Sequence, residues 1–292
     1  MRRRRFLMVA GAALMARPGV SEPVRWSGVA MGADVSVTLD GPRARAEAAI
    51  AEVRGIVRRM ELGFSLYDPG SELSRLNRDG RLDAPSDDMR ALLRLCAQVH
   101  RMTEGRFDPT VQPVWRALAT GGDVGRARQL VGWDRVRIDG AVRFEPGQAL
   151  TLNGIAQGYA TDAVRDALAR RGFRRVLVNI GEYAALGGGW KIGVEDPRLG
   201  LVHVATLDGR AVATSSPGAM RVGGAEHVLA PRGAASSRWS TVSVEADRAA
   251  LADGLSTGLC LCESEAAVRR VIEGSGAWAL LVDRSGQVIH IG

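Results

Sequence analysis

Apolar residues recur every three or four positions in four stretches of the chain, which is the spacing of an amphipathic helix. They predict helices from about residue 46 to 60, from 88 to 99 with Ser86 as the N-cap, from just after Gly158 to a stop at Gly172, and from 267 to 272. The inward positions that define the first three are Ile50, Val53, Val57 and Met60; Met89, Leu92, Leu93, Cys96 and Val99; and Ala160, Ala163, Val164, Ala167 and Leu168.

Short apolar runs rich in β-branched residues predict strands at residues 35–39, 176–180, 190–194, 203–207, 240–244, 279–282 and 288–291. These runs are not spaced regularly between helices, as a parallel α/β fold requires, and the turn Leu207-Asp208-Gly209-Arg210-Ala211 predicts a hairpin. We therefore expect an α+β fold with a mostly antiparallel sheet and flanking helices. The run Gly187-Gly188-Gly189 predicts a tight loop within one domain.

The composition is that of a soluble globular protein, with 46% hydrophobic and 24% charged residues over 292 positions. This balance excludes a disordered chain, and three cysteines exclude a disulfide scaffold. Cys260 and Cys262 have the spacing of a C-x-C metal pair, but no other cysteine or histidine cluster joins them. We interpret both as buried small apolar residues.

The first 21 residues have the layout of a signal peptide. Arg2 to Arg5 precede an apolar run from Phe6 to Ala16, which is too short to span a membrane as a helix. The N-terminal run Arg3-Arg4-Arg5-Phe6-Leu7 resembles the twin-arginine export signal, and an ordinary secretory leader is the alternative. No cysteine stands near the cleavage region, so we expect an exported, soluble, periplasmic protein without a lipid anchor, whose folded domain is 22–292.

The leader also accounts for most of the positive charge. The whole chain has 39 Lys and Arg against 32 Asp and Glu, a formal charge of +7. Removing residues 1–21 removes five arginines and no acids, which leaves 34 − 32 = +2. No basic stripe or aromatic platform suggests nucleic-acid binding, because Arg94, Arg101, Arg165 and Arg170 are predicted on solvated helix faces.

The stretch from Leu150 to Asp162, LTLNGIAQGYATD, is predicted to be a strand that breaks through glycines into the third helix. Such a break leaves backbone amides and a helix N-terminus facing the turn, which suits a phosphate group. A glycine-rich corner without any ligand is the alternative.

A second stretch, Ala252 to Gly258, contains a carboxylate and a hydroxyl four residues apart. If it is helical, Asp253 and Thr257 share one face and can converge on a hard cation such as magnesium, which takes oxygen ligands at about 2.0 to 2.1 Å. The alternative is an Asp N-cap followed by a Thr in the first turn.

Two further stretches contain polar residues at turns. In Thr103 to Val111, Asp108 either accepts from a heterocycle N–H or caps the Asp-Pro turn. In Glu226 to Gly233, His227 is either a base or a structural donor.

Together and in this order, the four stretches resemble the ApbE family, the FAD:protein FMN transferases. The resemblance also rests on Met31-Gly32, on Phe64 to Asn77, on Val178-Asn179-Ile180-Gly181 and on Val212-Ala213-Thr214-Ser215. It covers the chain from about Val29 to the C-terminus.

The resemblance implies an alpha-beta roll with FAD in a central cleft. It implies an Mg2+-dependent flavoprotein that transfers FMN from FAD through a phosphoester bond to a Thr or Ser hydroxyl of an exported redox protein and releases AMP. The partners would be FAD and this acceptor protein, with no nucleic acid and with membrane contact only through a membrane-bound acceptor. The alternatives are a catalytically weakened FAD-binding protein that acts in electron transfer or maturation, and an FAD pyrophosphatase that gives FMN and AMP.

The resemblance also implies residue roles. His227 would be the base that activates the acceptor hydroxyl, and Asp253 would be catalytic through the metal. The implied metal ligands are Gly154 through its carbonyl, Asp253, Ser256 and Thr257, and the implied flavin-nucleotide contacts are Met31, Tyr67, Arg106, Phe107, Asp108, Thr151, Gln157 and Leu229.

Three positions depart from the family pattern. An acid is usual where Thr151 stands, a glycine where Glu182 stands, and an aspartate where Ala230 precedes Pro231. The first change implies loss of a partner for adenosine or ribose, and the third implies weaker orientation of His227.

Overall fold

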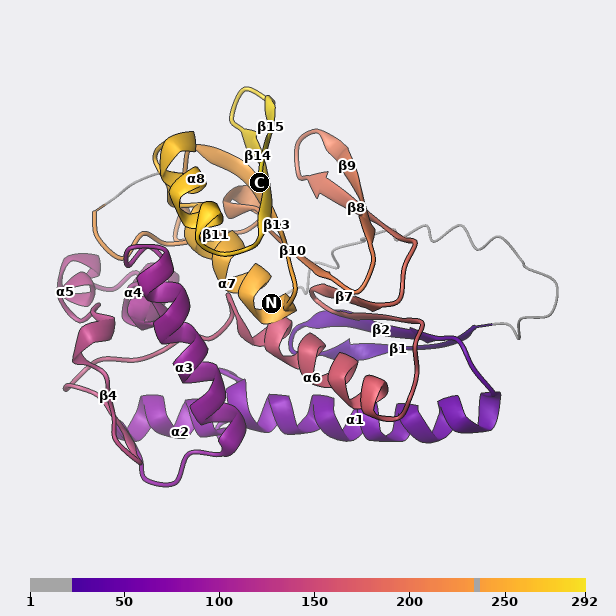
Figure 1. Ribbon diagram of the computed structural model, residues 1–292. Helices are drawn as coiled ribbons and strands as arrows, with labels where there is room; N and C mark the ends of the chain where they lie inside the picture. The colour runs from indigo at the N-terminus through magenta and orange to yellow at the C-terminus, as the bar shows by residue number, and fades with distance from the viewer. Residues whose placement is uncertain (1–22, 234–236) are drawn as a thin grey trace.

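A computed structural model describes residues 23–233 and 237–292; the predicted leader at 1–21 lies outside them. Its centre is an eight-stranded sheet in which every pair of neighbours is antiparallel (Figure 1). In spatial order the strands are β1 (Val24–Ala30), β2 (Ala33–Leu39), β6 (Val176–Ile180), β7 (Tyr183–Leu186), β10 (Ala211–Ser215), β13 (Trp239–Ala246), β14 (Trp278–Asp283) and β15 (Val288–Ile291). The predicted α+β class with a mostly antiparallel sheet is confirmed.

Helices pack against this sheet and bury a continuous apolar core. They are α1 (Arg43–Phe64), α2 (Glu72–Asp79), α3 (Asp87–Met102), α4 (Gln112–Thr120), α5 (Val124–Gln129), α6 (Ala156–Arg170), α7 (Ala249–Leu259) and α8 (Glu265–Glu273). α6 packs against β6 and β7, and α7 packs against β10 and β13. In Figure 1 the long α1 runs beneath α6, which it contacts. No helix in the described part of the chain is both long and apolar enough to cross a membrane.

Short elements complete the fold at its edges. Three-residue 3-10 turns occur at η1 (Pro109–Val111), η2 (Trp133–Arg135) and η3 (Pro217–Ala219). Small strands form the β3 (Arg81–Leu82), β5 (Val142–Arg143), β4 (Arg137–Ile138) sheet and the β11 (Arg221–Val222), β12 (Ala225–Glu226) pair.

A close crossing of α6 and α7 sets the position of the site. A Cβ added at Gly158 would lie 2.4 Å from the Ala249 carbonyl oxygen, so a glycine is needed where the two helices meet. From the next turn of α6, Asp162 accepts hydrogen bonds from the backbone N–H groups of Ala249 and Ala250, each at 3.0 Å. The crossing thereby holds the start of α6 against the start of α7.

The predicted hairpin across residues 207–211 is wrong. β9 (Gly200–Leu207) pairs with β8 (Trp190–Asp196) in a separate ribbon, whereas β10 pairs with β7 and β13 in the main sheet. The burial of the two strands explains the difference, because most of β9 is exposed while Ala211 to Ala213 are buried inside the main sheet.

Most other predicted elements are present with shifted ends, but the strand predicted to begin at Leu150 is not. The four helices and seven strands are present, and Ser86 Oγ accepts from the Met89 N–H as the predicted N-cap. α6 begins at Ala156, before the predicted start. Residues 150–152 form no strand, because the Asn77 side chain bonds both the N–H (2.7 Å) and the carbonyl (2.8 Å) of Leu150 in place of a partner strand.

Two side-chain predictions have opposite outcomes. Cys260 and Cys262 are buried as expected, and burial raises the pKa of the Cys262 thiol to about 11. Arg165, predicted on a solvated face, is 6% exposed; it donates to the Asp247 carbonyl at 2.9 Å and pairs with Asp162. Arg165 and Arg248 together compensate the charge of Asp162 inside the α6–α7 crossing.

Candidate functional site

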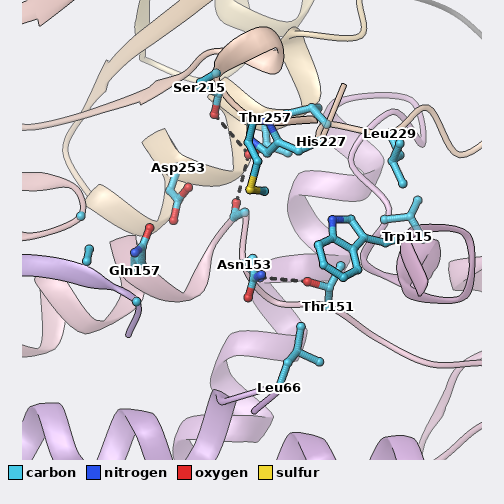
Figure 2. Close-up of a pocket in the computed structure, with 18 of the residues that line it drawn as sticks. Leu66, Trp115, Thr151, Asn153, Gln157, Ser215, His227, Leu229, Asp253 and Thr257 are labelled. Carbon is cyan, nitrogen blue, oxygen red and sulfur yellow. Dashed lines mark hydrogen bonds between the residues drawn. The ribbon is translucent and has the colours of Figure 1, made fainter. Parts of the chain in front are cut away.

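A cavity of about 1560 Å³ brings the predicted site residues together (Figure 2). Small-ligand pockets span about 300 to 1,000 Å³, so this cavity has room for a dinucleotide. All the predicted site residues line it except Met31 and Ser256: Tyr67, Arg106, Phe107, Asp108, Thr151, Gly154, Gln157, His227, Leu229, Asp253 and Thr257.

Oxygen atoms cluster where the α6 corner meets α7. Asp253 and Thr257 both lie within α7, which confirms the helix on which their predicted shared face depended. Asp253 is 3% exposed, and its Oδ2 accepts from the Gly158 N–H at 3.0 Å. Thr257 Oγ1 lies 3.5 Å from the Gly154 carbonyl oxygen and 3.4 Å from Ser215 Oγ, the contacts dashed in Figure 2. The cluster joins three segments that are far apart in the sequence.

The electrostatics of this cluster favour a cation. Burial raises the pKa of Asp253 to about 7, against the opposing effect of the hydrogen bond from Gly158. Glu182 lines the same cavity, and its Oε2 accepts from the Thr214 N–H at 3.1 Å. Burial, and then the negative charge of Asp253, raise the pKa of Glu182 well above its usual value. A cation beside the two carboxylates would remove this cost.

The donor set fits magnesium. The available ligands are a carboxylate, a carbonyl and hydroxyls, which are the oxygen donors that hard divalent cations prefer. Within residues 23–233 and 237–292, no group of three or more His, Cys, Asp or Glu side chains is placed to hold a metal ion, so a cation here would depend on the carbonyl and hydroxyl oxygens beside Asp253. Gly154 leaves space at the cluster, since a Cβ there would lie 2.8 Å from Thr257 Oγ1.

Ser256 lies behind the cavity wall. It is completely buried, donates to the Asp253 carbonyl at 3.0 Å, and lies 2.8 Å from Ser215 Oγ. Ser215, which Ser256 contacts through this hydroxyl, lines the cavity, whereas Ser256 does not.

His227 is held in one tautomer. Its Nδ1 lies 3.0 Å from the Pro217 carbonyl oxygen, and a carbonyl can only accept a hydrogen bond. Nδ1 therefore carries the proton in the neutral ring, and Nε2 has a free lone pair. Ala230 offers no side-chain acceptor, and its carbonyl accepts from Arg128 at 3.1 Å. In this chain the orientation of His227 therefore depends on Pro217.

The residues predicted to bind the nucleotide form the other walls. Asp108 uses its oxygens within the turn, accepting from the Thr110 N–H at 2.8 Å and from the Trp133 N–H at 3.3 Å. The structure thus shows the turn-capping role that the sequence left open, with the carboxylate bordering the cavity. Phe107 is buried beside it, and Tyr67 stands 80% exposed at the rim.

Gln157 lies in the first turn of α6, and Thr151 lies in the corner that leads into this helix. Gln157 Nε2 donates to the Met31 carbonyl at 3.2 Å, so Met31 contributes through its backbone and lies outside the cavity lining. Gly181 makes room for Gln157, because a Cβ at Gly181 would lie 2.6 Å from that side chain. Thr151 Oγ1 accepts from the Asn153 N–H at 3.3 Å.

Sequence reasoning missed several lining residues. Trp115, on the same side of Figure 2 as Leu229, comes from α4, and Ser215 comes from the end of β10. The available signal for Trp115 was an aromatic residue on a short amphipathic helix directly after the Asp-Pro turn. Ser215 follows three buried apolar residues and a threonine, a pattern that does not separate it from core residues.

Comparisons with known proteins show the family of the chain. Residues 31–280 match the model of the ApbE family. The chain is 26% identical over 254 residues to the FAD:protein FMN transferase of Haemophilus influenzae, covering 74% of this chain and 73% of that protein.

Solved structures of similar proteins share the fold. The apo flavinyl transferase ApbE of Pseudomonas stutzeri superposes with a TM-score of 0.81 at 28% identity, covering 94% of this chain and 96% of that one. The ApbE protein of Thermotoga maritima gives a TM-score of 0.84 at 23% identity, covering 92% and 97%. From its fold and the match over most of its length, the chain belongs to the ApbE family.

Proposed function

We propose that this protein is a magnesium-dependent FAD:protein FMN transferase. It would move FMN from FAD to a Thr or Ser hydroxyl of an exported redox protein and release AMP. The names of its relatives support flavin transfer, and the donor set supports magnesium. The open rim at Tyr67 gives an acceptor segment access to the cavity.

One observation carries the proposal. The oxygen cluster of Asp253, Thr257 and Gly154 and the ring of His227 line one cavity that is large enough for FAD. A cation site and a base with a free lone pair are the two groups that transfer of a phosphoryl group to a hydroxyl needs.

The reaction divides between these groups. His227 Nε2 accepts the proton of the acceptor hydroxyl, whose oxygen forms a bond to the phosphorus of the FMN half. The bond from this phosphorus to the bridging oxygen breaks, and AMP leaves with the electron pair. Asp253, Thr257 and the Gly154 carbonyl would hold Mg2+, which supplies neutralisation of the charge on the pyrophosphate. The Pro217 carbonyl stabilises the ring as it becomes imidazolium, because it accepts from Nδ1 in both states.

The test is to incubate the protein with FAD and Mg2+, with and without exported redox proteins as acceptors. AMP is measured by chromatography, and covalent flavin by in-gel fluorescence and intact mass. We expect AMP together with a labelled acceptor. AMP without label would indicate a pyrophosphatase, and bound FAD without AMP would indicate a binding protein; either outcome would overturn the proposal.

A further inference from the structure

A buried carboxylate that the proposed mechanism does not use borders the cavity. Asp196 ends β8 and is 2% exposed. Its Oδ1 accepts from the backbone N–H groups of Arg198 (2.9 Å) and Leu199 (3.1 Å). Its Oδ2 accepts from the hydroxyls of Ser240 (2.6 Å) and Thr241 (2.8 Å). Burial alone would raise the pKa of Asp196, but these four hydrogen bonds outweigh it and hold the pKa below its usual value.

The charge of Asp196 sets the direction of the next hydrogen bonds. An ionised carboxylate only accepts, so Thr241 must give its single hydroxyl proton to Asp196. Thr241 Oγ1 also lies 2.8 Å from Ser216 Oγ, and with its own proton used it can only accept there. Ser216 is therefore the donor, and its side chain is fixed on Thr241. Thr241 itself is fully buried, so its hydroxyl is shielded from solvent, while Ser216 lines the cavity.

Ser216 is the middle residue of a segment that holds both halves of the site. On one side, Ser215 Oγ contacts Ser256 Oγ at 2.8 Å and Thr257 Oγ1 at 3.4 Å. On the other side, the Pro217 carbonyl accepts from His227 Nδ1. A shift at Ser216 would move the hydroxyl next to the cation cluster and the acceptor that orients the base.

We infer that Asp196 is a positioning residue, which acts through Thr241 and Ser216 to fix segment 215–217 and thereby the orientation of His227. This inference rests on the proposed function for its kinetic consequences. Its structural consequence, the fixed tautomer of His227, does not depend on which reaction the protein catalyses.

The chain provides a matched control. Ser240 and Thr241 each donate one hydroxyl to the same oxygen of Asp196. Of the two hydroxyls, only that of Thr241 continues to Ser216; the other hydrogen bonds of Ser240 are to the backbone carbonyls of Val282 and Asp283 in β14. Thr241→Val and Ser240→Ala therefore each remove one bond to Asp196, but only Thr241→Val breaks the connection to segment 215–217.

The experiment compares Thr241→Val, Thr241→Ser and Ser240→Ala in the full protein. First, ¹⁵N NMR of the histidine rings at neutral pH reports the tautomer of His227, assigned by comparison with His227→Ala. Second, initial rates of AMP release give kcat and KM for FAD. We expect Thr241→Val to mix the two tautomers and lower kcat about tenfold or more, with little change in KM, because the base is misplaced while the binding walls remain. Thr241→Ser should restore both readouts, and Ser240→Ala should resemble the wild type.

Equal behaviour of Thr241→Val and Ser240→Ala in the NMR spectra would overturn the inference, as would a wild-type tautomer in Thr241→Val. If the wild type itself releases no AMP, the proposed function fails while the NMR comparison still decides the inference. A loss of melting temperature shared by both variants, without the tautomer change, would show that Asp196 only stabilises the fold.

Discussion

Replacement of Asp253 tests the cation cluster, and two variants separate charge from structure. Asp253→Asn removes the negative charge but keeps an oxygen that can accept from the Gly158 N–H. Asp253→Ala removes both, and leaves a buried backbone donor without its 3.0 Å partner. The two variants should therefore be alike in turnover and different in stability.

The magnitudes follow from the contacts. Loss of residues that only orient metal ligands costs about 10- to 100-fold, so loss of a direct ligand should cost more than about 100-fold in kcat/KM. An unpaired buried N–H costs about 1 to 3 kcal/mol, so Asp253→Ala should be less stable than Asp253→Asn by about that amount. Asp166→Asn, on a partly exposed surface pair with Arg248, is the control and should keep full turnover.

The assays are AMP release at saturating FAD, calorimetric titration of Mg2+ in the presence of FAD, and urea unfolding. Both Asp253 variants should lose turnover and magnesium binding together. If Asp253→Asn bound magnesium with wild-type affinity, or kept more than about a tenth of the wild-type rate, the assignment of Asp253 as a ligand would be refuted.

Three further predictions concern the base, the pH dependence and the helix crossing. His227→Ala should lower the transfer rate by a factor of about 10² to 10⁴, while FAD binding, followed by flavin fluorescence, is retained. A loss of FAD affinity by the same factor would contradict the role of His227 as a base. Burial in the folded protein raises the pKa of Asp253 from 3.8 to about 7. Between pH 4 and 7 the folded protein therefore still holds a proton on Asp253 that the unfolded chain has released. Urea unfolding without metal should therefore show stability falling across this range, and a smaller fall in Asp253→Asn; equal slopes would contradict the raised pKa. Gly158→Ala should lower the free energy of unfolding by about 3 kcal/mol, because the new Cβ would lie 2.4 Å from the Ala249 carbonyl oxygen. Gly55→Ala in α1 is the control: with nothing within 4 Å of its Cβ, it should be neutral or stabilising. Equal unfolding midpoints for the two variants would argue against the close crossing.

The helices and strands that were predicted correctly are those that the apolar pattern of their own residues identifies. α1 and α3 bury one continuous apolar face each, and β6 is buried along nearly its whole length, so their patterns identify them. β1 alternates between exposed and half-buried residues, and its signal is weak. The partners of a strand are not local: Asp208-Gly209 has the residues of a hairpin turn, yet the strands on its two sides pair with different sheets.

The same distinction applies to the site. Asp253 and Thr257 are four residues apart on one helix, and their spacing predicts their shared face. The connection from Asp196 to His227 joins residues 45 positions apart at its first step and 25 at the second, through the hydroxyls of a strand residue, Thr241, and of Ser216 just after β10. No spacing rule finds such contacts, because they depend on how β8, β13 and the segment after β10 come together in space.

The measurement that tests the central claim most directly is a crystal structure with FAD and Mn2+, which replaces magnesium and can be located by its anomalous scattering. The account predicts an anomalous peak within about 2.0 to 2.4 Å of an Asp253 carboxylate oxygen and the Gly154 carbonyl. The FAD pyrophosphate should bind this ion, with the phosphorus of the FMN half facing His227 Nε2. A peak away from α7, or a pyrophosphate bound outside the cavity, would contradict it.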